Sequence, residues 1–129
     1  MAYVYADVDD LEGEPLVGSH HCVALVQEYA KAPQTSLWSK GELVKTTKNL
    51  AKGTAIATFV NGVYPNNQTG NHAALFLSLE SDGINVMDQW KGDSKKPTIS
   101  SRKIRFKGMK NGKPIPPLSN NGDAYYVID

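Results

Sequence analysis

The sequence predicts an α+β fold in which one helix precedes an antiparallel β-sheet of about five strands. Apolar residues recur at helical spacing between residues 20 and 32. After Gly53, short runs rich in β-branched and aromatic residues alternate with clusters of turn-forming residues, which is typical of strands. The connections between these runs are too short for the crossover helices that parallel strands need, so we expect an antiparallel meander.

The length of 129 residues fits a single domain over residues 1–129, with an extended N-terminal segment over residues 1–17. The formal net charge of +1 does not suggest a nucleic-acid-binding surface. No window approaches the roughly 18 consecutive apolar residues of a membrane span. The acidic N-terminus lacks the basic and apolar regions of a secretory signal. The protein is therefore expected to be made in the cytoplasm, and any export needs a route without a cleaved signal.

The predicted helix covers residues 20–32. Gly18 and Ser19 precede it and are expected to form a turn, with Ser19 as a possible N-cap. One face carries apolar side chains at helical spacing, namely Cys22, Val26, Tyr29 and Ala30. Pro33 is expected to end the helix, because proline cannot continue one.

The part of the chain after the helix is predicted to form the sheet. Residues 34–50 are expected to be a polar connection leading into it. The predicted strands cover residues 54–60, 72–80, 84–90, 98–106 and 123–128. A tight turn at residues 81–83 joins the second and third strands. Segments 61–71 and 107–122 are rich in Gly, Pro and Asn and are expected to be loops.

Cys22 is the only cysteine, which excludes a disulfide within the chain and leaves a buried thiol, a metal ligand or a nucleophile. A free cysteine is often an inert core residue. The first turn of a helix favours the nucleophile, because the helix dipole and unpaired N–H groups there lower the pKa of a thiol. A metal site with His20, His21 and His72 is not favoured, because adjacent ligands do not converge easily. No metal or cofactor is expected.

His72 is the candidate general base, because it opens a predicted strand and has one wet and one buried side; a solvated loop-end histidine is the alternative. Asp88 lies in an apolar strand, where a carboxylate needs a partner, and its even separation from His72 lets both share one face. A three-residue turn at residues 81–83 would set Asp88 opposite Phe76, roughly 13 Å from His72. Contact then needs a wider loop or a bulge, and Gln89 replaces Asp88 if a bulge reverses the face.

The order of these residues resembles that of papain-like folds of the NlpC and CHAP kind. The segment HCVALVQEYA resembles their nucleophile helix, and KGTAIATF resembles the strand that follows it. The segment GNHAALFLSLESDGINVMDQW is similar to the CHAP block in which a histidine opens one strand and an acidic residue lies on the next. The pattern from Gly18 to Ile128 also resembles small bacterial proteins that include type VI secretion amidase effectors.

The resemblance implies a cysteine amidase or endopeptidase that acts on peptidoglycan stem peptides. Matched by position, Cys22 is the nucleophile, His72 the base and Asp88 the third catalytic residue. His21 departs from the pattern, because many relatives carry Gln or Asp there, and Trp90 stands where CHAP domains often have Asn. The backbone N–H of Cys22 is then the best candidate donor to an oxyanion.

Substrate contacts are expected from side chains around this array, namely His21, Tyr64, Asn71, Gln89 and Trp90. Tyr64 and Asn71 belong to the loop before His72, which is expected to form one wall of a groove. The alternative roles are turn formation for the loop residues, helix capping for His21 and core packing for Trp90.

Two other classes of function stay open at this point. The first is an inactive binding or inhibitory module on the same fold, which an ordinary pKa of the Cys22 thiol would favour. The second is a thiol acyltransferase or thioesterase, which an apolar channel beside Cys22 would favour. If the chain is an amidase toxin, it acts on the wall or in the periplasm of a target bacterium, needs secretion machinery to reach it, and is expected to have a cognate immunity protein.

Overall fold

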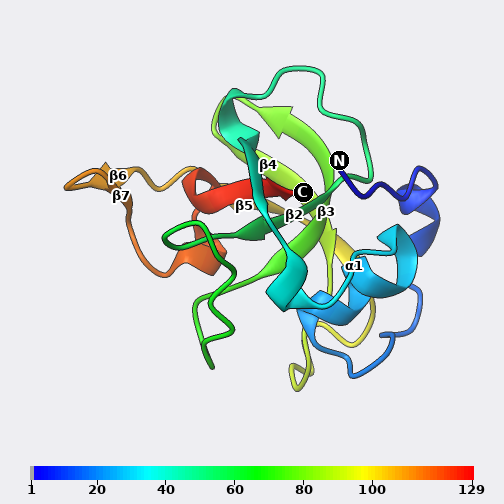
Figure 1. Cartoon of the computed structure of the whole chain (residues 1–129). Coiled ribbons are helices and arrows are strands. Elements are labelled where there is room, and N and C mark those ends of the chain that lie inside the picture. Colours follow the sequence, from blue (N-terminus) through cyan, green and yellow to red (C-terminus); the bar gives the residue numbers. More distant parts are fainter. Residues whose placement is uncertain (1) are drawn as a thin grey trace.

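Six antiparallel strands form one sheet in the computed structural model, which describes residues 2–129 (Figure 1). In the order in which they lie side by side, the strands are β1 (Lys40–Leu43), β8 (Tyr125–Ile128), β2 (Ala55–Thr58), β3 (Ala73–Glu80), β4 (Gly83–Asp88) and β5 (Ser100–Arg105). The helix α1 (Cys22–Ala30) packs on the sheet. Short 3-10 helices lie at Val8–Leu11, Thr35–Leu37, Val44–Thr46, Leu118–Asn120 and Gly122–Ala124. Within residues 2–129, no helix has the length and apolar character to cross a membrane.

The α+β class and the antiparallel meander are confirmed. The strands β2, β3, β4 and β5 follow one another in the sheet, and β8 returns to pair with the free side of β2. The sheet has six strands, in agreement with the expected number of about five. The additional strand β1 pairs Lys40 with Ile128 and lies in the segment predicted to be a polar connection. Its sequence, KGEL, lacks the alternation of a buried strand because it is an edge strand with half-exposed side chains.

A small hairpin interrupts the second predicted loop. It consists of β6 (Met109–Lys110) and β7 (Lys113–Pro114), and it projects from the body of the protein (Figure 1). Asn111 and Gly112 form its turn with positive φ angles of 55° and 76°. Two successive positive φ values are typical of the tight hairpin turn that an Asn-Gly pair favours.

The hairpin between β3 and β4 differs from the predicted one in two ways. Glu80 pairs with Gly83, so the turn has two residues and the expected three-residue turn is wrong. A bulge then shifts the register between Phe76 and Ser78. The shorter turn moves the β3 partner of each β4 residue by one position toward the start of β3, and from Val86 onward the bulge moves it by one position more. A total shift of two positions leaves each of these side chains on the face that the prediction gave it.

The helix α1 begins at Cys22, two residues later than predicted. Its N-cap is His21, which makes no side-chain capping bond, so Ser19 is not the cap. The helix ends when Lys31 adopts a left-handed conformation and its N–H bonds to the carbonyl of Val26, before Pro33 is reached. The predicted apolar face is too narrow, because Ala24 and Leu25 are buried as well.

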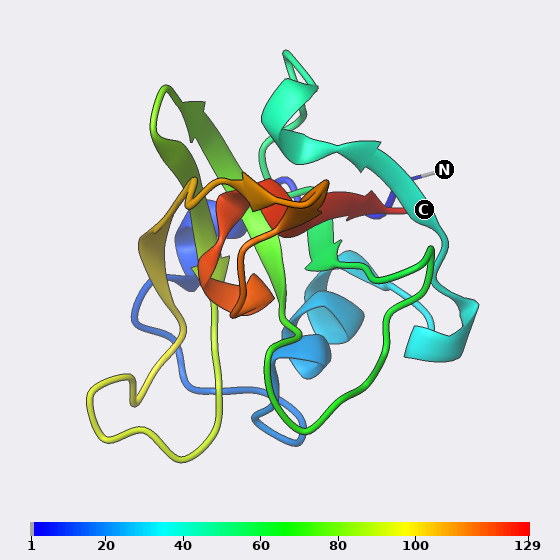
Figure 2. The same cartoon turned by 90° about the vertical axis from the view of Figure 1, so that its left-hand side faces the viewer.

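Two hydrophobic cores lie on opposite faces of the sheet. The first contains the buried face of α1, the N-terminal segment and side chains of β2, β3 and β4. The second contains Ile56, Phe76 and Tyr125, and Leu50 and Phe106 pack against it. Figure 2 shows residues 107–124 in front of the sheet and α1 behind it. Gly53 fits the N-terminal segment closely, because a Cβ there would lie 1.9 Å from the carbonyl oxygen of Tyr5.

Candidate active site

Three predicted residues meet at one end of the sheet. Cys22 is the first residue of α1, His72 directly precedes β3, and Asp88 is the last residue of β4. Leu75 pairs with Met87, and continuing this register sets Asp88 two residues from His72 on the same face. His72 Nε2 donates to Asp88 Oδ2 at 2.8 Å. The bulge therefore provides the contact that the predicted turn alone would not allow.

His72 is held rigidly and buried, with 5% of its surface exposed. Its backbone N–H donates to Thr58 Oγ1 at 3.1 Å, and its carbonyl accepts from the N–H of Thr58 at 3.0 Å. Burial lowers the pKa of His72, but its bonds to Asp88 and Cys22 outweigh burial and raise the pKa to about 9. Because Nε2 is bonded to Asp88, Nδ1 is the ring nitrogen left for Cys22.

Cys22 is partly exposed and interacts with His72. Burial raises the pKa of its thiol, whereas hydrogen bonding and charge interaction with His72 lower it, and the net result is a pKa below the ordinary value. The Tyr64 hydroxyl lies 3.8 Å from Cys22 Sγ. A thiol with a lowered pKa at a helix N-terminus, beside a histidine, has the surroundings of a reactive cysteine.

Asp88 carries more positive neighbours than the sequence predicted. Lys96 Nζ lies 2.9 Å from its Oδ1, and Arg102 Nε donates to its Oδ2 at 2.7 Å. The carboxylate is fully buried. Burial raises the pKa of Asp88, but His72, Arg102 and Lys96 together lower it to about 2. The carboxylate is therefore ionised at neutral pH and held from both oxygens.

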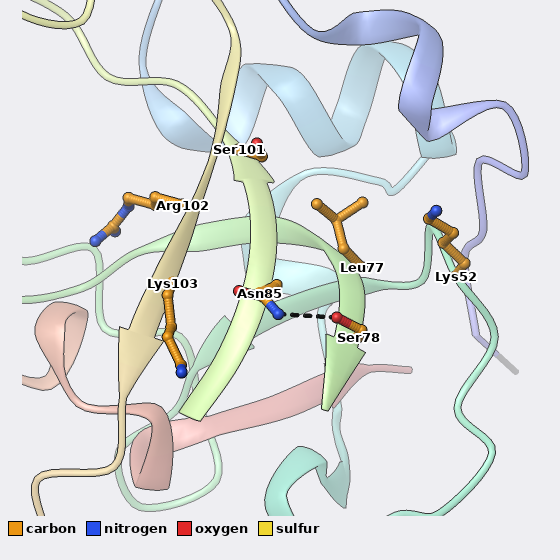
Figure 3. Close-up of a pocket in the computed structure, with 7 residues that line it drawn as sticks. All are labelled: Lys52, Leu77, Ser78, Asn85, Ser101, Arg102 and Lys103. Atoms are coloured by element: carbon orange, nitrogen blue, oxygen red, sulfur yellow. Dashed lines mark hydrogen bonds between the residues drawn. The ribbon is translucent and has the colours of Figure 1, made fainter. Parts of the chain in front are cut away.

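Arg102 was missed because the basic run from Ser101 to Lys110 is typical of a solvated strand edge, and Lys96 was missed because it lies in an irregular connection. Figure 3 shows why Arg102 differs from its neighbours: its side chain points away from Ser78 and Asn85, which line a depression of about 350 Å³ on β3, β4 and β5. Side chains alternate along a strand, so Arg102 reaches the face of Asp88 while Lys103 does not. The signal in the sequence that could have identified Arg102 is this alternation, which places it on the same face of the sheet as Asp88.

Trp90 packs against this cluster of charges. Lys96 Nζ lies 4.7 Å and the Arg102 guanidinium carbon 4.9 Å from the centre of its ring. Its ring also meets that of His72 at a centroid distance of 6.0 Å, and its Nε1 donates to Asp93 at 3.0 Å. Trp90 thus supports the two cations that hold Asp88.

Gln89 is fully buried and faces away from His72. Its Oε1 accepts from the N–H of Val17 at 3.0 Å, and its Nε2 donates to the carbonyls of Val17 at 3.1 Å and His21 at 2.8 Å. The structure therefore gives the position beside His72 to Asp88 and not to Gln89. Gln89 instead ties the turn before α1 to the end of β4, and this fixes where Cys22 lies.

The remaining predicted residues differ in how they lie relative to the Cys22 thiol. Asn71 Nδ2 donates to the Tyr64 hydroxyl at 3.1 Å, so both lie at the thiol. His21 is exposed at the helix N-terminus, and its neighbour His20 is exposed with a positive φ of 73°. Among residues 2–129, no group of three or more His, Cys, Asp or Glu side chains is placed to hold a metal ion.

Comparisons with known proteins agree with this architecture. The family model for domesticated amidase effector 2 matches residues 2–128. A type VI secretion amidase effector 2 protein of Salmonella typhi is 47% identical, with all of both chains covered. Domesticated amidase effector 2 of Ixodes scapularis is 38% identical over 96% of this chain and 82% of its own. The solved structure of type 6 secretion amidase effector 2 (Tae2) is 45% identical and superposes with a TM-score of 0.91, covering 98% of this chain and 94% of Tae2. The chain therefore belongs to the domesticated amidase effector 2 family.

Proposed function

We propose that this protein is a peptidoglycan amidase in which Cys22 is the nucleophile, His72 the base and Asp88 the residue that orients the base. The observation that carries the proposal is the array in which the His72 ring is hydrogen-bonded to the buried carboxylate of Asp88 at 2.8 Å and interacts with the thiol at the start of α1. The family and the names of the relatives, which are amidase effectors, support hydrolysis of an amide. The geometry of Cys22, His72 and Asp88 supports a cysteine mechanism for this hydrolysis.

In the first half of the reaction, the Cys22 thiolate attacks the carbonyl carbon of the scissile amide and forms a C–S bond. The lowered pKa of Cys22 and the raised pKa of His72 both favour the pair of thiolate and imidazolium. As the C–N bond breaks, His72 gives its proton to the leaving amine nitrogen. Asp88 keeps the ring oriented throughout, because Nε2 remains bonded to it.

In the second half, water attacks the thioester and His72 accepts its proton. The C–S bond breaks, a carboxylic acid leaves, and the Cys22 thiolate is restored. The oxyanion formed in each half needs donors. The backbone N–H of Cys22 is one, since the first residue of a helix has no intrahelical partner for its N–H. Gln89 positions this donor by holding the turn that precedes it.

The Tyr64 hydroxyl is the second donor that we assign to the oxyanion. It accepts from Asn71 and lies beside Cys22 Sγ, so its own proton is available to a group bound at the sulfur. Replacing Tyr64 with phenylalanine should lower kcat about 100- to 1000-fold and leave KM within about twofold, since the hydroxyl acts on the charge that develops in the transition state. Steady-state kinetics on a soluble muropeptide would measure both constants. An unchanged kcat, or a loss confined to KM, would contradict this role.

The experiment that tests the function is digestion of purified peptidoglycan followed by mass spectrometry of the released muropeptides. We expect each cleavage to add one water and to create a free amine and a free carboxylate. Products that gain a second peptide instead of water would identify an acyltransferase. Intact peptidoglycan with the protein bound to it would identify a binding module, and an ordinary pKa of the Cys22 thiol would accompany that result.

The relatives named as type VI secretion effectors favour delivery of this chain by a secretion system into a target bacterium. We therefore infer that its substrate is reached outside the cytoplasm, at the cell wall. A chain with this activity would endanger the cell that makes it if it leaked. Protection by a cognate immunity protein is thus part of the proposal, and co-purification from a producing strain would identify such a partner.

A further inference from the structure

A groove of about 1090 Å³ lies between the β6–β7 hairpin and the loop that follows β2. Its lining is largely apolar and includes Phe59, Val60, Pro116, Leu118 and Tyr126. The segments that flank it also expose large apolar side chains, namely Val60, Val63, Met109 and Ile115. Exposed apolar side chains that gather around a hollow indicate a surface that binds a ligand or partner.

Every charged residue that lines this groove is a lysine: Lys40, Lys110 and Lys113. None of the three forms an ion pair with an acidic residue in the part of the chain that the structure describes. Lys110 and Lys113 pair directly across the hairpin, where like charges repel. Such unbalanced charges favour an anionic ligand, since a carboxylate between them relieves the repulsion.

The groove leads toward the candidate active site. Val60, Pro116 and Leu118 also line a second hollow of about 290 Å³, which extends to Asn71. The Nδ2 of Asn71 bonds to Tyr64, which lies at Cys22. The Oδ1 of Asn71 is buried without a hydrogen-bond partner among residues 2–129, so it is an acceptor without a donor beside the hollow that Asn71 lines. A peptide with its scissile amide at Cys22 therefore extends along this path into the groove.

We propose that the groove binds the carboxylate-bearing part of the peptidoglycan stem peptide, with Lys110 and Lys113 holding its carboxylates and the apolar wall holding its aliphatic portions. This inference rests on the proposed function, because that function supplies an anionic peptide as the ligand. It assigns to the β6–β7 hairpin a role in selecting the substrate that is separate from the chemistry at Cys22.

The test compares two double variants that remove the same charge. Lys110→Gln/Lys113→Gln alters the groove, and Lys31→Gln/Lys48→Gln removes two lysines that do not line it. We expect the groove variant to raise the KM for a soluble crosslinked muropeptide about tenfold with kcat unchanged, which fits two partly exposed charge contacts. The control variant should leave both constants within about twofold. When the free carboxylates of the muropeptide are amidated, the two variants should have the same KM.

Calorimetry with the same muropeptides bound to the Cys22→Ala protein separates this inference from the proposed function. If hydrolysis fails but binding still weakens about tenfold in the groove variant alone, the amidase proposal falls and the groove stands. If hydrolysis proceeds and both double variants behave alike, the groove assignment is overturned. The groove assignment is also overturned if the groove variant weakens binding of the amidated muropeptide as much as binding of the unmodified one, since the lysines would then not bind the carboxylates.

Discussion

Replacing Cys22 with alanine should lower kcat/KM for muropeptide hydrolysis by at least about four orders of magnitude. The proposed reaction passes through a thioester, so a side chain without sulfur removes the covalent route altogether. The fold should persist, because Cys22 lies at the edge of the core, where its thiol contacts the Tyr64 hydroxyl. Release of muropeptides and thermal unfolding, measured on the same preparation, would check both statements.

The neighbouring His20 provides a matched control for this variant. It is exposed and has a positive φ, which asparagine tolerates well, so His20→Asn should keep the local backbone and retain activity within about twofold. The mechanism would be wrong if the Cys22→Ala protein kept more than about 1% of the wild-type rate while His20→Asn behaved as expected. Cys22 would then be a positioning residue or a core thiol.

The sequence was sufficient to predict the residues that meet at the candidate active site, but not how they meet. The even separation of His72 and Asp88 places them on one face of a hairpin, and the structure has them in contact. The contact depends on a two-residue turn and a bulge at Leu77, whose effects on the register add. Neither has a decisive sequence signal, because the segment from Ser81 to Gly83 suits turns of two or three residues equally well.

The partners of Asp88 were not predicted for a related reason. Lys96 lies beyond Asp88 in an irregular connection, and no periodic pattern indicates where such a side chain points. Arg102 is on a regular strand, so alternation places it on the face of Asp88 once the β4–β5 register is known. The same alternation places the Gln89 side chain on the other face of the sheet from Asp88, toward the turn before α1. Gln89 therefore cannot replace Asp88 beside His72.

Removing the Asp88 carboxylate should have the largest effect on stability of any change in this site. Asp88→Ala would leave His72, Lys96 and Arg102 facing one another with no anion between them. Loss of one partner from a buried ion pair costs about 3–5 kcal/mol, because an uncompensated charge remains buried. Such a loss is a large fraction of the roughly 5–15 kcal/mol by which domains are stable. Denaturant unfolding monitored by circular dichroism would measure it.

Asp82 is a matched control, since it also pairs with two cations but on the surface. Lys103 and Arg105 contact its carboxylate, whose side chain is 50% exposed. Asp82→Ala should therefore have a much smaller effect than Asp88→Ala, because solvent already screens those pairs. Equal losses in the two variants would show that burial of Asp88 does not set the strength of its contacts, and the electrostatic account of the site would fail.

The pH dependence of stability gives a further check on Asp88 with a definite sign. Its pKa is lowered from 3.8 to about 2 in the folded protein, so its contribution to the free energy of unfolding is fully present above pH 3.8. The contribution is lost as the pH falls through about 2, where the folded carboxylate becomes protonated. The stability difference between wild type and Asp88→Ala should therefore narrow over this acid range. It should also narrow as the pH rises from 6.5 through about 9, because the raised pKa of His72 depends on Asp88 and His72 loses its proton there. A difference that stays constant throughout the acid range would mean that packing, not charge, makes Asp88 necessary for the fold.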